Sequence, residues 1–151
     1  MVDPTLTILL AEDDDGHAWL VERHLRRAGV QAAISRASDG QAALDYVHGR
    51  NAVRPGPLLV LLDIRMPRVD GVEVLRQLKS ARATAAIPVI MLTTTDNPAE
   101  IRRCYALGCN VYLTKPVAAD GLAEAMRRLG EFLAIMRVSD EASPTPQERP
   151  S

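Results

Sequence analysis

Aromatic residues, cysteines and long apolar runs are all scarce in this chain of 151 residues. Aromatic side chains make up only 3% of it, so an aliphatic core is expected, and the apolar fraction of 47% is large enough to build one. The longest apolar run has the length of a strand, far short of the roughly 18 residues that span a membrane. No signal-peptide pattern opens the chain, and no metal-ligand pattern surrounds the two cysteines. We therefore expect a cytoplasmic protein without a membrane-spanning segment.

An excess of charge of one sign is also missing. The 18 basic and 19 acidic residues give a net charge of -1. This balance argues against a nucleic-acid-binding surface spread over the whole protein, and no nucleic-acid partner is expected. Any function of the charged residues must come from their positions.

Apolar runs and helical patterns alternate along the chain. Such alternation predicts an α/β fold with a parallel sheet and helices on both of its faces. One domain is expected over residues 5–137, and residues 138–151, rich in Pro, Ser and Glu, are expected to be a disordered tail. The predicted strands are 7–11, 31–37, 58–62, 87–92 and 111–114, and the predicted helices are 17–28, 39–49, 71–80, 97–107 and 120–137.

Charged and hydroxyl side chains follow several of these strands. Ligands of an open parallel sheet bind beyond the carboxyl ends of its strands, so these side chains should converge. Carboxylates without His or Cys favour a hard cation, Mg²⁺ first, and a lysine and a hydroxyl opposite them would complete a phosphoryl-binding site. Asp63 is the best nucleophile, because it stands alone after the central strand and a carboxylate can form an acyl phosphate. The residues at the strand ends are Glu12, Asp13, Asp14, Asp15, Asp63, Thr93, Thr94, Thr95 and Lys115.

Each group taken alone also has a structural explanation. An acidic run after a strand is commonly a solvated loop, and Asp14 and Asp15 stand where a helix is expected to begin, so they can serve as cap residues. Taken alone, Lys115 would be interpreted as a surface lysine. The joint occurrence of these groups at separate strand ends is what favours a site.

Four segments in sequence resemble the receiver domains of two-component response regulators. They are ILLAED at 8–13, LLDIRMPRVDG at 61–71, IPVIMLT at 87–93 and GCNVYLTKP at 108–116. The resemblance covers residues 5–137 and implies a flavodoxin-like, doubly wound (βα)5 fold with strand order 2-1-3-4-5. It also implies a phosphorelay protein that is phosphorylated by a histidine kinase and acts by conformational switching and protein contact, without an output domain.

The same resemblance implies a role for each site residue. Asp63 accepts the phosphoryl group. Mg²⁺ is bound by Asp13 directly, by Glu12 through water, by Asp63 itself and by the backbone carbonyl of Arg65. Lys115 pairs with the phosphate, Thr93 moves to hydrogen-bond it, and Tyr112 swings inward behind Thr93.

A narrower resemblance suggests the partners. Residues 93–95, 101–108 and 112–117 look like the stand-alone regulators of phytochrome-type sensor kinases, so a bacteriophytochrome is one candidate for the kinase. Members of that group commonly form homodimers through the fourth helix, the fifth strand and the fifth helix. The apolar side chains of the last helix, which either join such an interface or pack on the sheet, are Leu122, Met126, Leu129, Phe132, Leu133 and Met136. On the first helix, the residues that are either kinase contacts or ordinary surface residues are His17, Trp19, Leu20 and Arg23.

Two other functions use the same residues. A phosphatase-like enzyme of the haloacid dehalogenase type would carry a second Asp two residues after the nucleophile, where this chain has Arg65, and it would have a cap domain. A receiver fold kept only as a binding module would not need the complete set of acids, hydroxyl and lysine. Arg65 could either shield the acyl phosphate from water or stabilise the departing phosphate, so the lifetime of the phosphate is left open.

Overall fold

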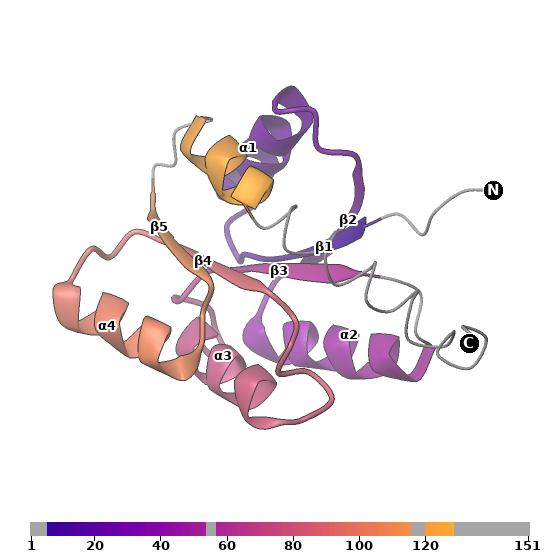
Figure 1. Ribbon diagram of the computed structural model, residues 1–151, viewed down its shortest axis with the longest axis vertical. Coiled ribbons are helices and arrows are strands. Elements are labelled where there is room, and N and C mark those ends of the chain that lie inside the picture. The colour runs from indigo at the N-terminus through magenta and orange to yellow at the C-terminus, as the bar shows by residue number, and fades with distance from the viewer. Residues whose placement is uncertain (1–5, 54–56, 116–119, 129–151) are drawn as a thin grey trace, which may run out of the picture.

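The computed structural model describes residues 6–53, 57–115 and 120–128, with side chains for all of these except 50–53. Its centre is a parallel five-stranded sheet with the strand order β2-β1-β3-β4-β5 (Figure 1). This order and the flavodoxin-like fold confirm the prediction. The strands are β1 (Leu6–Ala11), β2 (Ala32–Ala37), β3 (Leu58–Leu62), β4 (Val89–Thr93) and β5 (Val111–Thr114). The helices are α1 (Asp15–Arg27), α2 (Gly40–Val53), α3 (Gly71–Ser80), α4 (Pro98–Leu107) and a segment at 120–128.

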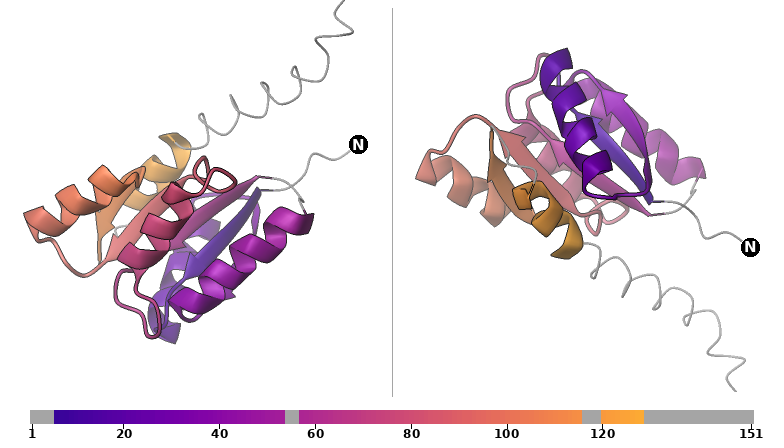
Figure 2. Two further views of the ribbon diagram at one scale, coloured as in Figure 1. Left: turned by 90° about the horizontal axis from the view of Figure 1, so that it is seen from below. Right: turned by 90° about the horizontal axis from the view of Figure 1, so that it is seen from above.

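The helices form a layer on each face of the sheet. Figures 1 and 2 show α1 and helix 120–128 on one face, with α2, α3 and α4 on the other. Because side chains alternate between the faces of a strand, β3 contributes to two separate cores. Val60 and Leu62 pack toward α2 and α3, whereas Leu59 and Leu61 pack toward α1 and helix 120–128. All five residues of β3 are buried, as predicted for a central strand.

Side-chain caps and glycines set the ends of the helices. The carboxylate of Asp14 accepts from the backbone N–H of His17, and the amide oxygen of Asn97 accepts from that of Ala99. Gly29 and Gly108 have φ angles of +83° and +111°, which glycine adopts without steric cost after a helix. Both glycines end helices as the sequence predicts.

Most element boundaries agree with the prediction to within one residue, and the larger differences are in α2, α1 and β4. Helix α2 continues through Gly49 to Val53 instead of ending near residue 49, because Gly49 does not take the positive φ that ends α1 and α4. Helix α1 begins two residues early, at Asp15, directly after its cap. Strand β4 begins at Val89 rather than at residue 87, because the N–H of Ile87 closes a turn onto the carbonyl of Thr84 and proline 88 has no N–H.

Two predicted features lie outside the described residues. They are the last helix beyond residue 128 and the disordered tail at 138–151. Among the described residues, no helix combines the length and the apolar character that crossing a membrane requires.

Candidate functional site

Three carboxylates meet where β1 and β3 end. Glu12 follows β1 and is 2% exposed, and Asp63 follows β3 and is 7% exposed, while Asp13 faces solvent. One oxygen of each carboxylate lies within 4.8 Å of the other two. The structure thus brings together the acids that the sequence predicts to converge. Asp14 and Asp15 are the helix cap and the first helical residue, in agreement with their structural explanation.

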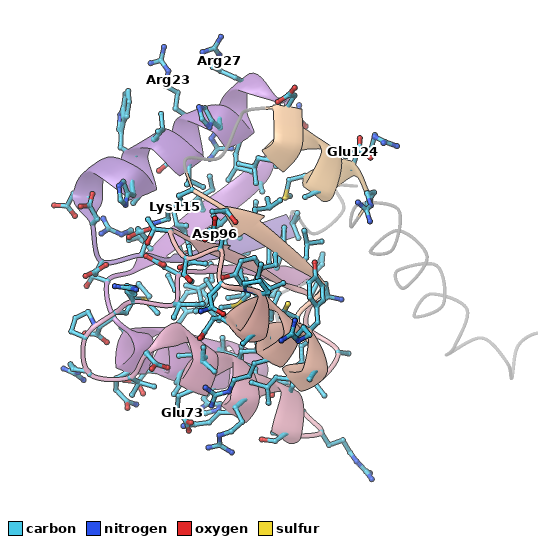
Figure 3. All side chains as sticks on the ribbon, turned by 90° about the vertical axis from the view of Figure 1, so that its left-hand side faces the viewer. Arg23, Arg27, Glu73, Asp96, Lys115 and Glu124 are labelled. Carbon is cyan, nitrogen blue, oxygen red and sulfur yellow. The ribbon has the colours of Figure 1, made fainter. Side chains whose placement is uncertain are left out.

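Lys115 joins this cluster from the end of β5, where Figure 3 labels it. Its Nζ atom donates to Asp63 Oδ2 at 3.1 Å and to Glu12 Oε1, and the lysine side chain is only 8% exposed. Its backbone N–H donates to the carbonyl of Thr93 at 2.7 Å, which fixes the lysine beside the end of β4. The lysine is a member of the cluster rather than a free surface residue.

The cluster carries more negative than positive charge. Glu12, Asp13 and Asp63 face a single ammonium group, that of Lys115. Burial raises the pKa of Glu12 above its ordinary value, even though the hydrogen bond from Lys115 acts in the opposite direction. A cation would relieve both the repulsion and the burial cost, and a set of carboxylate oxygens without imidazole or thiolate suits Mg²⁺. These residues therefore fit a hard divalent cation.

Arg65 lies in the exposed part of the loop between β3 and α3, two residues beyond Asp63. Ligation by its backbone carbonyl stays a prediction.

Arg36, on β2, supports the acidic loop in a way that sequence reasoning missed. Its Nε atom donates to the backbone carbonyl of Glu12 at 2.8 Å, and its guanidinium forms an ion pair with Asp15 at 2.9 Å. The parallel register of β1 and β2, which pairs Leu10 with Arg36, brings the arginine beside this loop. That register was the signal that could have identified it.

The loop that follows Asp63 is packed against neighbouring backbone. The N–H of Gly71 donates to the carbonyl of Ile64 at 2.8 Å, and a Cβ atom on Gly71 would lie 2.0 Å from the carbonyl oxygen of Asp63. On the other side, a Cβ atom on Gly40 would lie 1.8 Å from the carbonyl oxygen of Val69. Glycine is therefore required at both positions for space rather than for backbone conformation.

A chain of hydrogen bonds connects the end of β4 to β5. Thr93 is fully buried, and its hydroxyl oxygen accepts from the N–H of Thr95 at 3.5 Å. The carbonyl of Thr95 accepts from the hydroxyl of Tyr112 at 2.8 Å. Burial raises the pKa of Tyr112 to about 12, so the hydroxyl remains protonated and able to donate. The two predicted switch residues are thus linked through one loop residue.

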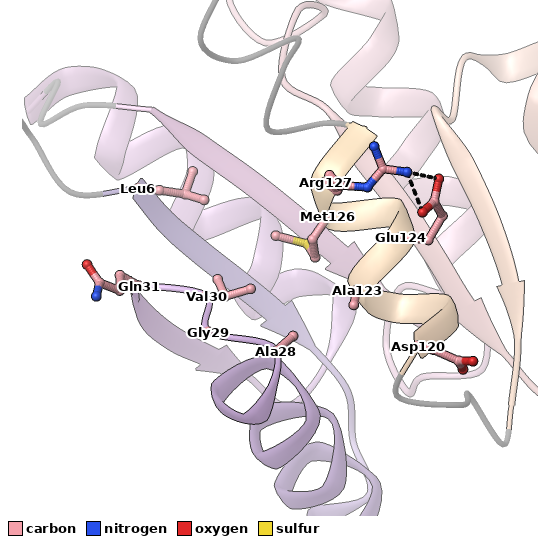
Figure 4. Close-up of a pocket in the computed structure, with 10 residues that line it drawn as sticks. All are labelled: Leu6, Ala28, Gly29, Val30, Gln31, Asp120, Ala123, Glu124, Met126 and Arg127. Carbon is pink, nitrogen blue, oxygen red and sulfur yellow. Dashed lines mark hydrogen bonds and ion pairs between the residues drawn. The ribbon is translucent and has the colours of Figure 1, made fainter.

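A hollow of about 500 Å³ lies away from these residues (Figure 4). It is lined by the start of β1, the turn between α1 and β2, and helix 120–128. None of the strand-end residues borders it, so it is not part of the candidate site.

Known proteins with similar sequences span most of this chain. The profile described as the response regulator receiver domain matches residues 8–127. The probable methanogenesis regulatory protein FilR2 of Methanothrix harundinacea (strain 6Ac) is 41% identical over 131 residues, covering 86% of this chain and 84% of that protein. The response regulator Rcp1 of Synechocystis sp. is 36% identical over 115 residues, covering 75% of this chain and 78% of Rcp1.

Solved structures agree with the sequence comparisons. A response regulator receiver domain from Rhodospirillum rubrum is 44% identical, with a TM-score of 0.71 and coverage of 85% of this chain and 94% of that one. The bacteriophytochrome response regulator RtBRR is 34% identical, with a TM-score of 0.73 and coverage of 86% and 79%. The Mn(2+)-bound form of Rcp1 is 31% identical, with a TM-score of 0.68 and coverage of 85% and 94%.

Receiver domains are generally signalling proteins; they interact with histidine kinases and typically bind Mg²⁺ or Mn²⁺ at an acidic cluster. The profile match, the relatives and the strand order all lead to one assignment. This chain belongs to the response regulator receiver domain family, and it is a response regulator of a phosphorelay.

Proposed function

We propose that this protein accepts a phosphoryl group on Asp63 from a sensor histidine kinase and passes the signal on by a change in conformation. One observation carries the proposal: the buried carboxylate of Asp63 lies within 4.8 Å of two other carboxylates and 3.1 Å from the ammonium of Lys115. A nucleophile, a candidate cation site and a fixed positive charge are therefore together at one edge of the sheet.

In the transfer step, a carboxylate oxygen of Asp63 attacks the phosphorus of a phosphohistidine. An O–P bond forms as the N–P bond breaks, and the leaving imidazole keeps the bonding electron pair and takes up a proton. Lys115, already in contact with Asp63 Oδ2, would stabilise the negative charge on the transferred phosphoryl oxygens. Because the lysine is 8% exposed, little water weakens this interaction.

Glu12, Asp13, Asp63 and the backbone carbonyl of Arg65 are the proposed Mg²⁺ ligands. The surplus negative charge of the cluster and its all-oxygen ligand set support this assignment, as does the Mn(2+)-bound structure of the related Rcp1. A bound divalent cation would neutralise charge on the phosphoryl oxygens during transfer.

The proposed switch uses the hydrogen-bond chain between β4 and β5. If the hydroxyl of Thr93 turns to the phosphoryl group, the N–H of Thr95 loses its acceptor. The position of Thr95 then changes, and its carbonyl is the group to which the Tyr112 hydroxyl donates. Tyr112 can then move inward as Thr93 moves, so a new charge at Asp63 changes the surface of α4 and β5.

Exposed residues of α1 form the proposed kinase contact. Trp19 is 60% exposed and Leu20 38% exposed, and the Arg23 guanidinium lies 5.3 Å from the centre of the Trp19 ring. Arg23 and Arg27 project outward from α1 in Figure 3. RtBRR is described as a bacteriophytochrome response regulator, which supports a kinase of that type. The nearly balanced charge supports action without a nucleic-acid partner. The proposed action is through protein contacts in the cytoplasm, without enzymatic turnover.

The proposed domain covers residues 5–137, and the proposed homodimer forms through α4, β5 and the last helix. The exposed Tyr105 of α4 supports such a surface. Leu122 and Met126, in contrast, are buried against the sheet, so these two residues contribute to the core. The remaining apolar residues expected on the last helix lie outside the described part of the chain.

Phosphorylation by a small-molecule donor tests the proposal directly. The wild type, incubated with acetyl phosphate and Mg²⁺, should gain one base-labile phosphoryl group by intact-mass spectrometry, and Asp63→Asn should gain none. Asp45→Asn is the matched control, because Asp45 is an exposed aspartate of α2 whose side chain accepts from Gln41 and is not a member of the carboxylate cluster. Equal uptake by Asp63→Asn and the wild type would show that another residue is the acceptor.

A further inference from the structure

His17 contacts the candidate site from the first turn of α1. Its backbone N–H donates to the cap residue Asp14 at 2.9 Å, which fixes the start of the side chain. Its Nδ1 atom lies 3.2 Å from Lys115 Nζ, whereas the nearest acidic oxygens, of Glu12 and Asp14, are at 3.9 and 4.0 Å. The imidazole therefore interacts more closely with the lysine than with either acid.

The chemistry of the two groups sets the direction of this hydrogen bond. A lysine ammonium can only donate, so Nδ1 of His17 must be the acceptor and the ring proton must be on Nε2. Lys115 has three N–H groups, and the structure gives it three acceptors: Glu12 Oε1, Asp63 Oδ2 and His17 Nδ1. The first two are acids of the site, and the third is not.

We propose that His17 is a positioning residue for phosphoryl transfer, which accepts the third N–H of Lys115 and thereby holds the ammonium between Glu12 and Asp63. This inference rests on the proposed role of Asp63 as phosphoryl acceptor. The His17 side chain is 48% exposed and that of Lys115 is 8% exposed, so the lysine is the more buried partner of this contact. Without it, one N–H of Lys115 would turn to water, and the ammonium would be free to leave the orientation that phosphoryl transfer needs.

Two amide substitutions separate this role from a general effect of polarity or size. The side-chain oxygen of asparagine can occupy the place of Nδ1, whereas the polar end of glutamine reaches the place of Nε2. His17→Asn therefore keeps an acceptor for Lys115, and His17→Gln and His17→Ala do not. The two amides are equally neutral and hydrophilic, so each serves as the control for the other.

The first measurement is the rate of phosphoryl uptake from acetyl phosphate at saturating Mg²⁺ and several donor concentrations. We expect His17→Asn to stay within about twofold of the wild type, and His17→Gln and His17→Ala to be about fivefold slower in maximal rate, the value of one hydrogen bond. Urea unfolding of each variant identifies any loss of folded protein. Equal rates for Asn and Gln, whether both fast or both slow, would overturn the inference.

The second measurement does not depend on phosphorylation. Nitrogen-15 spectra of the imidazole, at about pH 8.5 where histidine is ordinarily neutral, report which ring nitrogen carries the proton. The wild type should show the Nε2–H form alone, and Lys115→Met should show a mixture of both forms. An Nδ1–H form in the wild type would also overturn the inference. If the wild type took up no phosphate, the function proposed for Asp63 would fail, and the spectra would still report on the contact between His17 and Lys115.

Discussion

Adding a single methyl group at Gly71 should displace the proposed phosphoryl acceptor. Gly71 is the first residue of α3, and its N–H donates to the carbonyl of Ile64. In Gly71→Ala, the new Cβ atom would lie 2.0 Å from the carbonyl oxygen of Asp63, about 1.4 Å inside the 3.4 Å at which ordinary contact begins. The backbone fixes the position of a Cβ atom, and the carbonyl is part of the backbone, so neither group can rotate away.

The size of the effect follows from this overlap. Forcing an extra carbon into close-packed surroundings costs about 1–3 kcal/mol. We expect a loss of about 2 kcal/mol in the free energy of unfolding, which corresponds to a decrease of roughly 6–10 °C in Tm for a domain of this size. Because the shift moves Asp63 itself, the rate of phosphoryl uptake should fall by about 10- to 100-fold.

Urea unfolding and uptake from acetyl phosphate measure the two effects separately. Gly49→Ala is the matched control, because Gly49 is an exposed helical residue of α2 whose Cβ atom would meet nothing within 4 Å. This control should gain about 0.5–1 kcal/mol from the better helix propensity of alanine and keep the wild-type rate. A Gly71→Ala protein as stable and as active as the wild type would refute the steric argument.

Four further predictions concern the support of the acidic loop and the buried core. Arg36→Ala should release the acidic loop and weaken Mg²⁺ binding about fivefold in calorimetric titration. Arg36→Lys should recover little of the lost affinity, because a lysine cannot contact the Glu12 carbonyl and Asp15 at once as the guanidinium does. Unchanged affinity in both variants would contradict this prediction. Burial raises the pKa of Cys104, and it raises that of Cys109 from 9.0 to about 12, so neither thiol should react with a disulfide reagent at about pH 8 until the protein unfolds. A thiol whose pKa is higher in the folded than in the unfolded protein stabilises the fold at pH values below the unfolded pKa. For Cys109 this stabilisation should be lost as the pH rises from about 9 to 12, and the free energy of unfolding should decrease over that range. The decrease should be smaller in Cys109→Ala. Thr84→Val should cost about 1 kcal/mol in urea unfolding, because the buried hydroxyl of Thr84 donates to the carbonyl of Leu78 at 2.6 Å; no loss would show that this bond contributes nothing net.

Much of the fold could be predicted because its signals are local. Strand β3 is apolar at every position, and β3, α3 and β5 have the predicted boundaries. The glycines that end α1 and α4 are also recognisable from neighbouring residues alone. The same type of signal gave a wrong helix end at Gly49. A glycine of this kind ends a helix where its φ is positive, and whether it is positive depends on the path that the chain takes after the glycine.

The main acids of the site were also predictable, because strand ends of a parallel sheet share one edge. Lys115 was expected opposite the phosphate, and the structure adds its direct bond to Glu12. The supporting contacts depend on how strands and helices are placed in space rather than on a local pattern. Arg36 reaches the acidic loop only through the register of β1 and β2, and His17 meets Lys115 across 98 residues of sequence. Neither contact leaves a periodic pattern in the chain.

The hydroxyl of Tyr105 has a consequence for how other proteins can recognise this one. β5 is an edge strand, and such edges offer free N–H groups to which a second chain can add as a further strand. In this protein the N–H of Tyr112, in the middle of that edge, already donates to Tyr105 at 3.1 Å. A partner at this edge must therefore either displace an aromatic side chain or bind through side chains alone. Recognition through side chains would make the contact sensitive to the position of Tyr112.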